Sequence, residues 1–333
     1  MKQSLIAISI GPVQDFIKSA RRTRDLWFGS HMLSEIAKDA ARAVKEAGGK
    51  LIFPNPAASG DLAPDSDFTV ANVILAETGD AEEAAKRAEA AAQGRWLEFA
   101  EEARKKAGNM IRDDVWDKQL SDVVEFYAAW ATVENGEYKD ARNRVMRLLA
   151  ARKNCRDFAP FLGQAGLPKS SLDGLRETVL KENARSTGAL RIKPGESLCA
   201  VGVTKRAAGK GYFPSVSRVA VDPWIRGLKA ESAAWNEIEA IKEQCDALVR
   251  LGALSRVRVD GGLFEEFPYE GTALYLDRLV SIGKEAPVGS DVTDVLEKIR
   301  GSLLVLQKKK FGAPSPYFVV LCADGDKMGK AIS

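Results

Sequence analysis

Two aspartates near the C-terminus are the residues of this chain best suited to metal chemistry. Asp324 and Asp326 follow the apolar run Tyr317–Ala323 and are separated by Gly325. A strand ending in Asp-Gly-Asp fixes the first carboxylate, the glycine lets the backbone approach a ligand, and a following helix offers N–H groups to phosphate. Mg²⁺ keeps several waters, so one or two carboxylates plus substrate phosphates suffice to hold it. The alternative is an ordinary turn, in which Asp-Gly-Asp is also common.

The N-terminus has the same layout without the carboxylates. The apolar run Leu5–Ile10 is broken by Gly11 and followed by a long helical pattern. When the two strand ends are aligned, Gly11 stands in the place of Asp324 and Val13 in the place of Asp326. This indicates a weak internal duplication whose first copy can cradle phosphate but cannot bind a metal. The alternative is chance, because any two strand-turn-helix units look alike at this length.

The predicted N-terminal helix carries residues that suit a nucleotide. Arg21 and Arg24 are three apart and share a helix face, while Trp27 and Phe28 offer aromatic surface, so phosphate pairing and base stacking are both possible. A helical glycine costs about 1 kcal/mol relative to alanine, so Gly29-Ser30 suggests close approach by a ligand or another backbone. The alternative is a solvated arginine face with Trp27 in the core.

Composition limits the class of protein. The chain has 333 residues, 45% hydrophobic and 29% charged, which fits two globular domains and the start of a third. A net charge of +3 argues against a protein with a wholly basic surface. We expect Lys205-Arg206, Lys210 and Lys308–Lys310 to be solvated, with RNA contact as the alternative. The only histidine, His31, precedes Met32, which excludes a His-Asp nuclease module, and we expect it to be a packing or surface residue.

The cysteines and the hydropathy pattern indicate a compartment. Cys155, Cys199, Cys245 and Cys322 are far apart and form no Cys-x-x-Cys pair, so neither a disulfide framework nor a zinc ribbon is expected. No apolar run approaches the roughly 18 residues of a membrane span, and the N-terminus lacks a signal-peptide profile. We therefore expect a reduced, cytoplasmic protein with no membrane partner.

Hydrophobic patterning predicts an α+β fold that starts with a ferredoxin-like unit. The order β-α-β-β-α-β is typical of that unit, in which both helices cover one face of an antiparallel sheet. The expected strands are Leu5–Ile10, Leu51–Phe53, Phe68–Ala76 and Val123–Val133, and the expected helices are Val13–Ala47 and Asp80–Ala107, the latter with Asp80 as N-cap.

The remainder is predicted to be mainly helical with an irregular insertion. We expect three domains: 1–136, 137–310, and the incomplete start of another unit at 311–333. The expected helices are Tyr138–Lys153, Ser171–Glu182, Lys229–Leu251 and Val292–Lys309, with a short strand around Val257–Val259 and a final strand Tyr317–Ala323.

At these residues the chain resembles the large palm-domain subunit of type III CRISPR RNA-guided effector complexes, in its Cmr-type (III-B) form. The similar segments are spread over nearly the whole chain, and the first and last are specific together. They are Ile10–Ile17, Ala20–Ser30 with Leu33-Ser34, Pro168–Gly174, Leu198–Val201 with Lys205-Arg206, Phe213–Ser215 and Ala323–Lys330.

The resemblance implies a function and a site. In that family two palm domains face each other across a small domain, bind ATP between them, and make cyclic oligoadenylate when the complex holds matching target RNA. The implied partners are other type III-B effector subunits, with guide and target RNA met mostly through the complex. The implied ligands of Mg²⁺ or Mn²⁺ are Asp324 and Asp326, and the implied ATP-binding residues are Gly325, Asp326 and Lys327 of the second palm and Gly11, Gln14, Arg21, Gly29 and Ser30 of a degenerate first palm.

Three departures from the family pattern limit what the resemblance implies. No N-terminal His-Asp nuclease domain is present, so cleavage of single-stranded DNA is not expected. The family often has a zinc site built from cysteine pairs, and only Cys155 and Cys199 occupy that region, so no zinc is expected. The Gly-Gly-Asp-Asp hairpin of the second palm is absent, because Gly48-Gly49 precedes Lys50 and Gly261-Gly262 precedes Leu263.

The leading hypothesis is the N-terminal portion of a type III-B large subunit, with one complete palm, the helical middle domain and the first strand of the catalytic palm. We expect this portion alone to make no oligoadenylate. A non-catalytic scaffold that docks guide-RNA-bearing subunits is the first alternative. A palm-type nucleotide cyclase relative that takes its carboxylate hairpin from another chain is the second.

Overall fold

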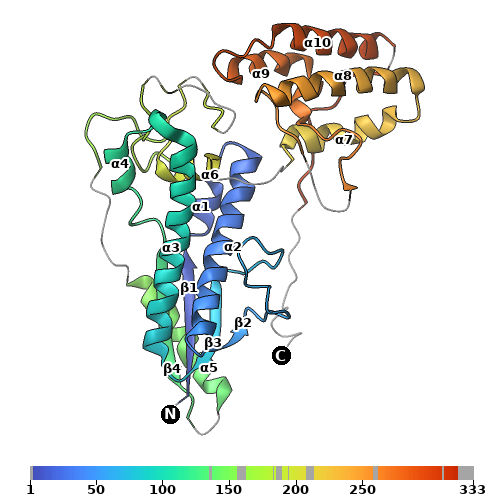
Figure 1. Cartoon of the computed structure of the whole chain (residues 1–333). Helices are drawn as coiled ribbons and strands as arrows, with labels where there is room; N and C mark the ends of the chain where they lie inside the picture. The colour runs from blue at the N-terminus through green and yellow to red at the C-terminus, as the bar shows by residue number, and fades with distance from the viewer. Residues whose placement is uncertain are drawn as a thin grey trace. The chain divides into compact units, whose positions relative to one another are not determined.

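The chain divides into two compact units, residues 1–211 and residues 212–333 (Figure 1). The computed structural model describes residues 3–134, 137–155, 163–182, 184, 190–193, 195–207, 214–257, 262–309 and 311–321. The units are described separately below. In the described part of the chain, no helix is both long enough and apolar enough to cross a membrane.

A four-stranded antiparallel sheet forms the centre of the first unit. Its order is β2-β3-β1-β4, and every neighbouring pair is antiparallel. Strand β1 is central because Leu5–Ile10 is apolar on both faces apart from Ser9 and is buried throughout. Ile8 of β1 lies opposite Ile74 and Ala128. The strands are β1 (Ser4–Gly11), β2 (Lys50–Phe53), β3 (Val73–Thr78) and β4 (Glu125–Thr132).

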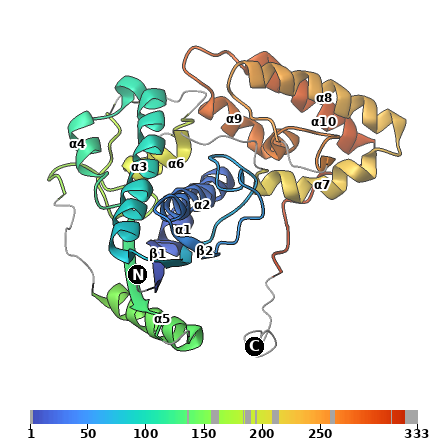
Figure 2. The same ribbon diagram turned by 60° about the horizontal axis from the view of Figure 1, so that its bottom comes forward.

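The sheet is covered on both faces. Ile6, Ile8 and Ile10 of β1 pack into the core formed with α2 (Thr23–Glu46) and α3 (Ala81–Ala107). The alternate residues Leu5 and Ala7 pack instead with Ala141, Val145 and Leu149 of α5 (Tyr138–Asn154). Because successive strand residues point to opposite faces, α5 lies on the side of the sheet opposite to α2 and α3 (Figure 2).

Helix α3 forms where it was predicted. The Asp80 side chain accepts a hydrogen bond from the Glu83 N–H, which confirms Asp80 as the N-cap. Its inner face is rich in buried alanine, so α2 and α3 pack closely. Trp96 of α3 is fully buried and donates from Nε1 to the Leu120 carbonyl at 3.0 Å. The predicted order of strands and helices through residue 132 is thus observed.

The predicted continuous helix Val13–Ala47 is wrong. The chain forms a short α1 (Gln14–Lys18) and then α2, with residues 19–22 between them outside any helix. The Ser19 hydroxyl donates to the Asp15 carbonyl, and Lys205 Nζ donates to the Phe16 and Ser19 carbonyls. A distant lysine therefore binds carbonyl groups that a continuous helix would have bonded internally, and the helix breaks there.

The segment from residue 163 to residue 207 also differs from the prediction. Ser171–Glu182 forms turns and isolated bridges rather than a helix, because its backbone pairs with distant segments, for example Val179 N–H with the Leu198 carbonyl at 2.8 Å. A helix that was not predicted, α6 (Ala200–Ala207), follows and packs against α2 and α3. The shorter elements η1 (Gly108–Met110) and α4 (Asp113–Lys118) complete this unit.

The second unit is helical. Helices α8 and α10 confirm the predicted helices near Lys229–Leu251 and Val292–Lys309, whereas α7, with Pro223 inside it, was not predicted. Its core is lined by aliphatic and aromatic side chains such as Ile238, Phe267 and Leu303. The elements are α7 (Val216–Leu228), α8 (Ser232–Arg250), η3 (Gly271–Leu274), η4 (Leu276–Arg278), α9 (Leu279–Glu285) and α10 (Thr293–Lys308).

Within the residues that the structure describes, neither of the two strands predicted for this unit is a strand. Tyr317–Leu321 has no strand partner among the described residues and is largely exposed, with Leu321 at 92%. A strand needs a neighbour for its backbone groups, so an apolar pattern alone does not make one. Val257, at the start of the other predicted strand, is not in a strand, and residues 258–259 lie outside the described residues, as do 322–333.

Candidate functional site

The first turn of the predicted nucleotide site follows the central strand. Gly11 is the last residue of β1, and a Cβ atom at this position would lie 3.3 Å from Oε2 of Glu125 on β4. Gln14 begins α1 and is exposed. The strand thus ends next to a carboxylate, and the exposed amide of Gln14 is a group that can donate to an anionic ligand.

Arg21 and Ser30 lie on the exposed surface near the start of α2. Arg21 Nη2 donates to the Ser171 carbonyl at 3.0 Å, which ties residues 19–22 to the irregular segment after residue 163. Ser30 is exposed on α2. Trp27 is 49% exposed and Phe28 is 1% exposed, packed edge-on to Phe99 at 5.8 Å. The predicted aromatic platform is therefore divided, with Trp27 at the surface and Phe28 in the core.

Gly29 is buried under the side chain of a lysine. A Cβ atom on residue 29 would lie 3.2 Å from Lys205 Cε, while the nearest backbone atom outside α2, Ile17 Cα, would be 3.7 Å away. The close approach at Gly29 is made by a side chain of this protein's own α6, rather than by the ligand or backbone that the sequence suggested. The glycine creates room for Lys205 to cross α2.

Lys205 is almost fully buried and links three elements. Its Nζ donates to the carbonyls of Phe16 and Ser19, both at 2.6 Å, and lies 5.2 Å from the centre of the Phe16 ring. Burial lowers the pKa of Lys205 to about 8, although Asp25 and other nearby groups favour its charged form. The end of α1 is therefore held by a lysine whose charge is costly to keep.

Arg206, the next residue on α6, lies in a buried ion triad. Its Nε donates to Asp25 at 2.7 Å, and its two terminal nitrogens donate to the two Glu196 oxygens at 3.2 and 3.0 Å. Burial alone would raise the pKa of Glu196, but the hydrogen bonds and charge of Arg206 outweigh it and the pKa is lowered. All three side chains are at most 3% exposed, so this triad fixes α6 to the start of α2.

A second buried ion network lies further along α2. Lys38 Nζ donates to Glu35 at 2.6 Å and to Ser66 Oγ at 3.0 Å, and Arg95 of α3 reaches the other Glu35 oxygen at 3.2 Å. Burial would raise the pKa of Glu35, but the Lys38 hydrogen bond and the Asp65 N–H lower it. The network joins α2, α3 and the loop before β3.

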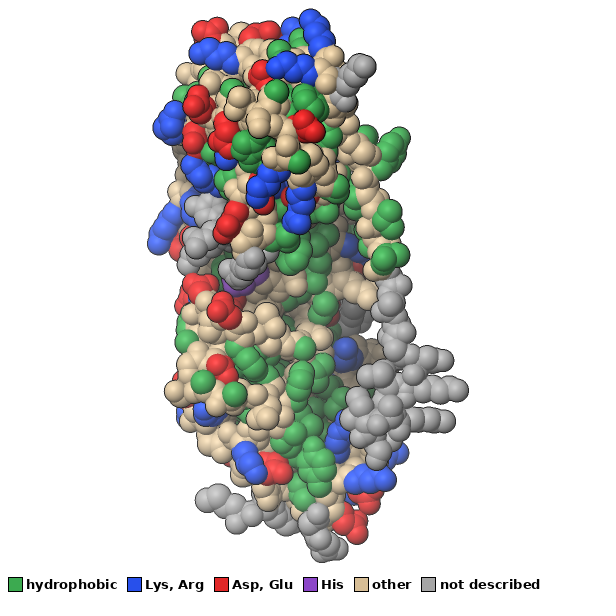
Figure 3. All heavy atoms as spheres, turned by 90° about the vertical axis from the view of Figure 1, so that its right-hand side faces the viewer, with side chains coloured by type: hydrophobic (Ala, Val, Ile, Leu, Met, Phe, Trp, Pro, Cys, Tyr) green, Lys and Arg blue, Asp and Glu red, His purple; other side chains and the backbone are tan. Residues whose placement is uncertain are grey.

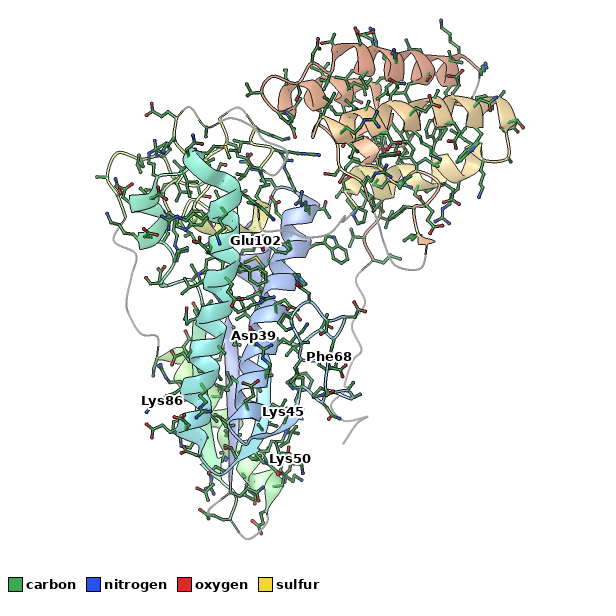
Figure 4. All side chains as sticks on the ribbon, viewed as in Figure 1. Asp39, Lys45, Lys50, Phe68, Lys86 and Glu102 are labelled. Carbon is green, nitrogen blue, oxygen red and sulfur yellow. The ribbon has the colours of Figure 1, made fainter. Side chains whose placement is uncertain are left out.

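Two further ionisable residues flank that network. Asp39 lies between α2 and α3 (Figure 4), and burial raises its pKa although Arg42 Nη2 is 3.0 Å away. His31 lies 3.7 Å from Asp65 and near the Phe28 and Phe99 rings, and burial lowers its pKa. Its ring contacts agree with the expectation of a packing residue.

The prediction that Lys205 and Arg206 are solvated is wrong. Both side chains are buried because α6, which begins with the apolar residues Ala200–Val203, lies in the core and carries them inward. The sequence signal was present, since only Thr204 separates the two charges from an apolar run, and all of them can lie in the same buried helix. The Phe16 and Ser19 carbonyls that bind Lys205 and the Asp25 carboxylate that binds Arg206 were not foreseen, because they are distant along the chain.

The predicted metal site cannot be compared with the structure. Asp324, Gly325, Asp326 and Lys327 lie outside the described residues. Among the residues that are described, no three His, Cys, Asp or Glu side chains cluster as metal ligands. The metal therefore has no described ligand set, whereas Gln14, Arg21 and Ser30 are exposed donors that suit phosphate oxygens.

Solved structures that match this chain come from type III CRISPR complexes. The type III-B Cmr-beta structure in the apo state is 14% identical, with 95% of this chain and 43% of that chain covered and a TM-score of 0.58. The structure of Cmr-beta bound to cognate target RNA is 14% identical, with 69% of this chain and 38% of that chain covered and a TM-score of 0.49. The structure of the apo Csm1-Csm4 cassette is 18% identical, with 46% of this chain and 19% of that chain covered and a TM-score of 0.28. The first match shows the shared fold, and the other two add no argument.

The chain spans less than half the length of the Cmr-beta chains that it matches. No curated protein sequence matches it. A family model described as "CRISPR-associated protein Cmr2, N-terminal" matches residues 5–101, which run from β1 through most of α3 and include Gly11, Gln14, Arg21, Gly29 and Ser30. Residues 5–101 therefore match the N-terminal model of the CRISPR-associated Cmr2 family, in agreement with the resemblance seen in the sequence motifs.

Proposed function

We propose that this chain is part of the large subunit of a type III-B CRISPR effector complex and acts in antiviral defence. The observation that carries the proposal is the Cmr2 N-terminal match over residues 5–101, at the segment where the sequence motifs are most specific. The fold shared with apo Cmr-beta over 95% of this chain supports it. The partners proposed are other effector subunits, with guide and target RNA met mostly through the complex.

The first unit is proposed to be a degenerate palm domain of ferredoxin-like topology. Its support is the β-α-β-β-α-β order together with the all-antiparallel strand order β2-β3-β1-β4. The position at the end of β1, where a catalytic palm would place its first carboxylate, is Gly11. Such a domain can hold a nucleotide but leaves the metal to the opposite palm.

The nucleotide is proposed to be ATP, bound at the surface formed by the β1–α1 turn and the start of α2. Gln14, Arg21 and Ser30 are exposed and carry donors for phosphate oxygens. Gly29 would contribute indirectly, because its missing side chain admits Lys205. Asp324 and Asp326 stay proposed ligands of Mg²⁺ or Mn²⁺, with Gly325 and Lys327 beside the triphosphate. The metal would neutralise phosphate charge during the nucleotidyl transfer that makes cyclic oligoadenylate.

Titration of the chain with ATP tests the nucleotide half-site. We expect saturable binding by isothermal titration calorimetry, weakened at least tenfold by Arg21→Ala, because a phosphate contact by arginine is charge-assisted. Ser30→Ala should weaken it less. Arg87→Ala on α3 is the control, since Arg87 is exposed and pairs with Glu83. Oligoadenylate made by the purified 333-residue chain with ATP and Mg²⁺ would contradict the need for a second palm.

A non-catalytic scaffold is the second candidate function. The observation that favours it is that the space above Gly29 is filled by Lys205, so this glycine is not itself open to a ligand. In that case the wild-type chain would bind no ATP, while still associating with other effector subunits in size-exclusion chromatography. ATP binding that depends on Arg21 would exclude a purely structural role.

A further inference from the structure

Helix α5 concentrates positive charge that the rest of the chain does not have. Its 17 residues include six basic side chains and one acidic side chain, Asp140, giving +5. The whole chain carries +3, so everything outside α5 sums to −2. Helix α3 carries six basic and six acidic residues over 27 positions. On the face shown in Figure 3, basic and acidic side chains are also interspersed.

Two of the six α5 cations have an acidic or aromatic partner within the protein, and Arg147 Nε donates to the Asn143 carbonyl of α5, at 3.3 Å. Arg144 pairs with Glu134 at 3.7 Å. Arg152 donates to the Cys155 carbonyl and lies 5.7 Å from the centre of the Tyr127 ring, on the sheet. Because Arg144 and Arg152 have these partners within the protein, neither is counted among the exposed basic residues of α5.

The other four cations form an exposed basic face. Lys139, Arg142, Arg147 and Lys153 are exposed, and none forms an ion pair with an acidic side chain in the part of the chain that the structure describes. At 3.6 residues per turn they fall within less than half of the helix circumference. Lys139 and Lys153 are about 21 Å apart along the axis, from a rise of about 1.5 Å per residue.

The cations of α3 show the contrasting arrangement. Lys86 pairs with Glu82 at 2.7 Å, and Arg87 pairs with Glu83 at 2.6 Å. Such i, i+4 pairs satisfy a solvated helix without a partner molecule. The four like charges of the α5 basic face repel one another, which costs stability unless an anionic partner neutralises them.

The packing of α5 restricts what that partner can be. Ala141, Val145 and Leu149 are buried against the sheet. A helix that lies on a membrane surface inserts its apolar face among the lipids, and in α5 this face is already covered. A line of Lys and Arg side chains about 20 Å long fits a partner whose negative charges repeat along a line, as phosphates do in a nucleic-acid strand.

We propose that the basic face of α5, Lys139, Arg142, Arg147 and Lys153, binds the phosphate backbone of an RNA strand. The contact is independent of base sequence, because side chains reaching phosphates carry no sequence information. It is also independent of the ATP half-site, since α5 covers the opposite face of the sheet from α2. RNA binding and ATP binding can therefore fail separately.

Fluorescence anisotropy with a labelled oligouridylate of about 20 nucleotides tests the proposal, using the full 333-residue chain at several salt concentrations. Each single-strand phosphate contact contributes about −0.7 to the slope of log K against log salt, so four contacts predict a slope of about −2.8. The double variant Arg142→Gln/Lys153→Gln should reduce the slope by about 1.4 and the affinity at 0.1 M salt roughly tenfold or more.

The matched control is Lys86→Gln/Arg87→Gln, which removes two exposed charges from α3. Lys86 points away from α2 (Figure 4). The control should keep the wild-type slope. Equal losses in both double variants, or an unchanged slope in the α5 variant, would overturn the proposal. So would competition by poly-glutamate as effective as unlabelled RNA at equal charge, because the face would then fit an acidic protein. Thermal unfolding of both variants verifies that they fold.

Discussion

The Lys205 side chain lies directly over Gly29, with Cε 3.2 Å from the position that a Cβ atom would take on residue 29. Lys205 cannot simply move aside, because its Nζ is bonded to the Phe16 and Ser19 carbonyls. The glycine, the lysine and the end of α1 therefore form one packed unit, next to residues proposed to bind ATP.

Gly29→Ala should destabilise the chain. The added methyl group collides with a lysine held by two hydrogen bonds, and overpacking of this kind costs about 1–3 kcal/mol, more than the gain of up to about 1 kcal/mol in helix propensity. Gly94→Ala on α3 is the matched control, because nothing lies within 4 Å of its Cβ position. It should stabilise by about 0.5–1 kcal/mol. Urea unfolding measures both, and stabilisation by Gly29→Ala would contradict the packing argument.

Lys205→Met should remove a pH dependence from the stability. Burial lowers the pKa of Lys205 to about 8, whereas the unfolded side chain titrates near 10.5. Between these values the unfolded state binds more protons, so the free energy of unfolding of the wild type rises with pH relative to the variant. Across the whole interval between the two pKa values, the free energy of unfolding of the wild type rises by about 3 kcal/mol relative to the variant.

Urea unfolding of both proteins from pH 7 to pH 10 checks this dependence. Titration of all other groups cancels in the difference between wild type and variant. A difference that is flat across this range would show that Lys205 keeps an ordinary pKa. At every pH the variant also leaves the Phe16 and Ser19 carbonyls without their donor, a cost of about 1–3 kcal/mol for each buried group.

Arg206→Met should destabilise strongly, by about 3–5 kcal/mol, because it leaves Asp25 and Glu196 as buried carboxylates without their cation. Arg87→Met on α3 removes an exposed pair with Glu83 and should cost less than about 1 kcal/mol. Equilibrium unfolding at pH 7 compares the two. Similar costs for both substitutions would mean that the triad is solvated in solution.

Glu35→Gln should destabilise the chain at neutral pH and much less at acidic pH. The pKa of Glu35 is lowered, since Lys38 and the Asp65 N–H outweigh burial, so its carboxylate stabilises the fold above the unfolded value of 4.5. This contribution is lost as the pH falls through the lower folded value. We expect a cost of about 3 kcal/mol at pH 7 that shrinks below pH 4.5. Glu98→Gln, at an exposed partner of Arg95, should cost less than about 1 kcal/mol throughout.

Local patterns predicted the first unit well. The continuous apolar run of β1 and the alanine-rich helix with Asp80 as its N-cap are properties of neighbouring residues, and both form as predicted. The break at residues 19–22 could not be predicted in this way, because Lys205, which binds the carbonyls there, is more than 180 residues away. Periodicity alone indicated one helix through the break.

The second half was harder to predict for the same reason. Helix α10 has a regular apolar period and was found, whereas residues 171–182 resemble a helix locally but pair with the backbone near Leu198. Tyr317–Leu321 has the composition of a strand and lacks a strand partner among the described residues. In both segments the outcome depends on distant backbone groups.

The sequence by itself determined the resemblance to the Cmr2 family and the residues at which a nucleotide is expected, because motifs such as Gly11-Pro12-Val13-Gln14 are local. Only the tertiary structure decided why residue 29 is glycine and what Lys205 and Arg206 do. The physical reason is that burying a charge requires a partner, and the partners of these two residues, Phe16, Ser19 and Asp25, come together with them only when the chain folds.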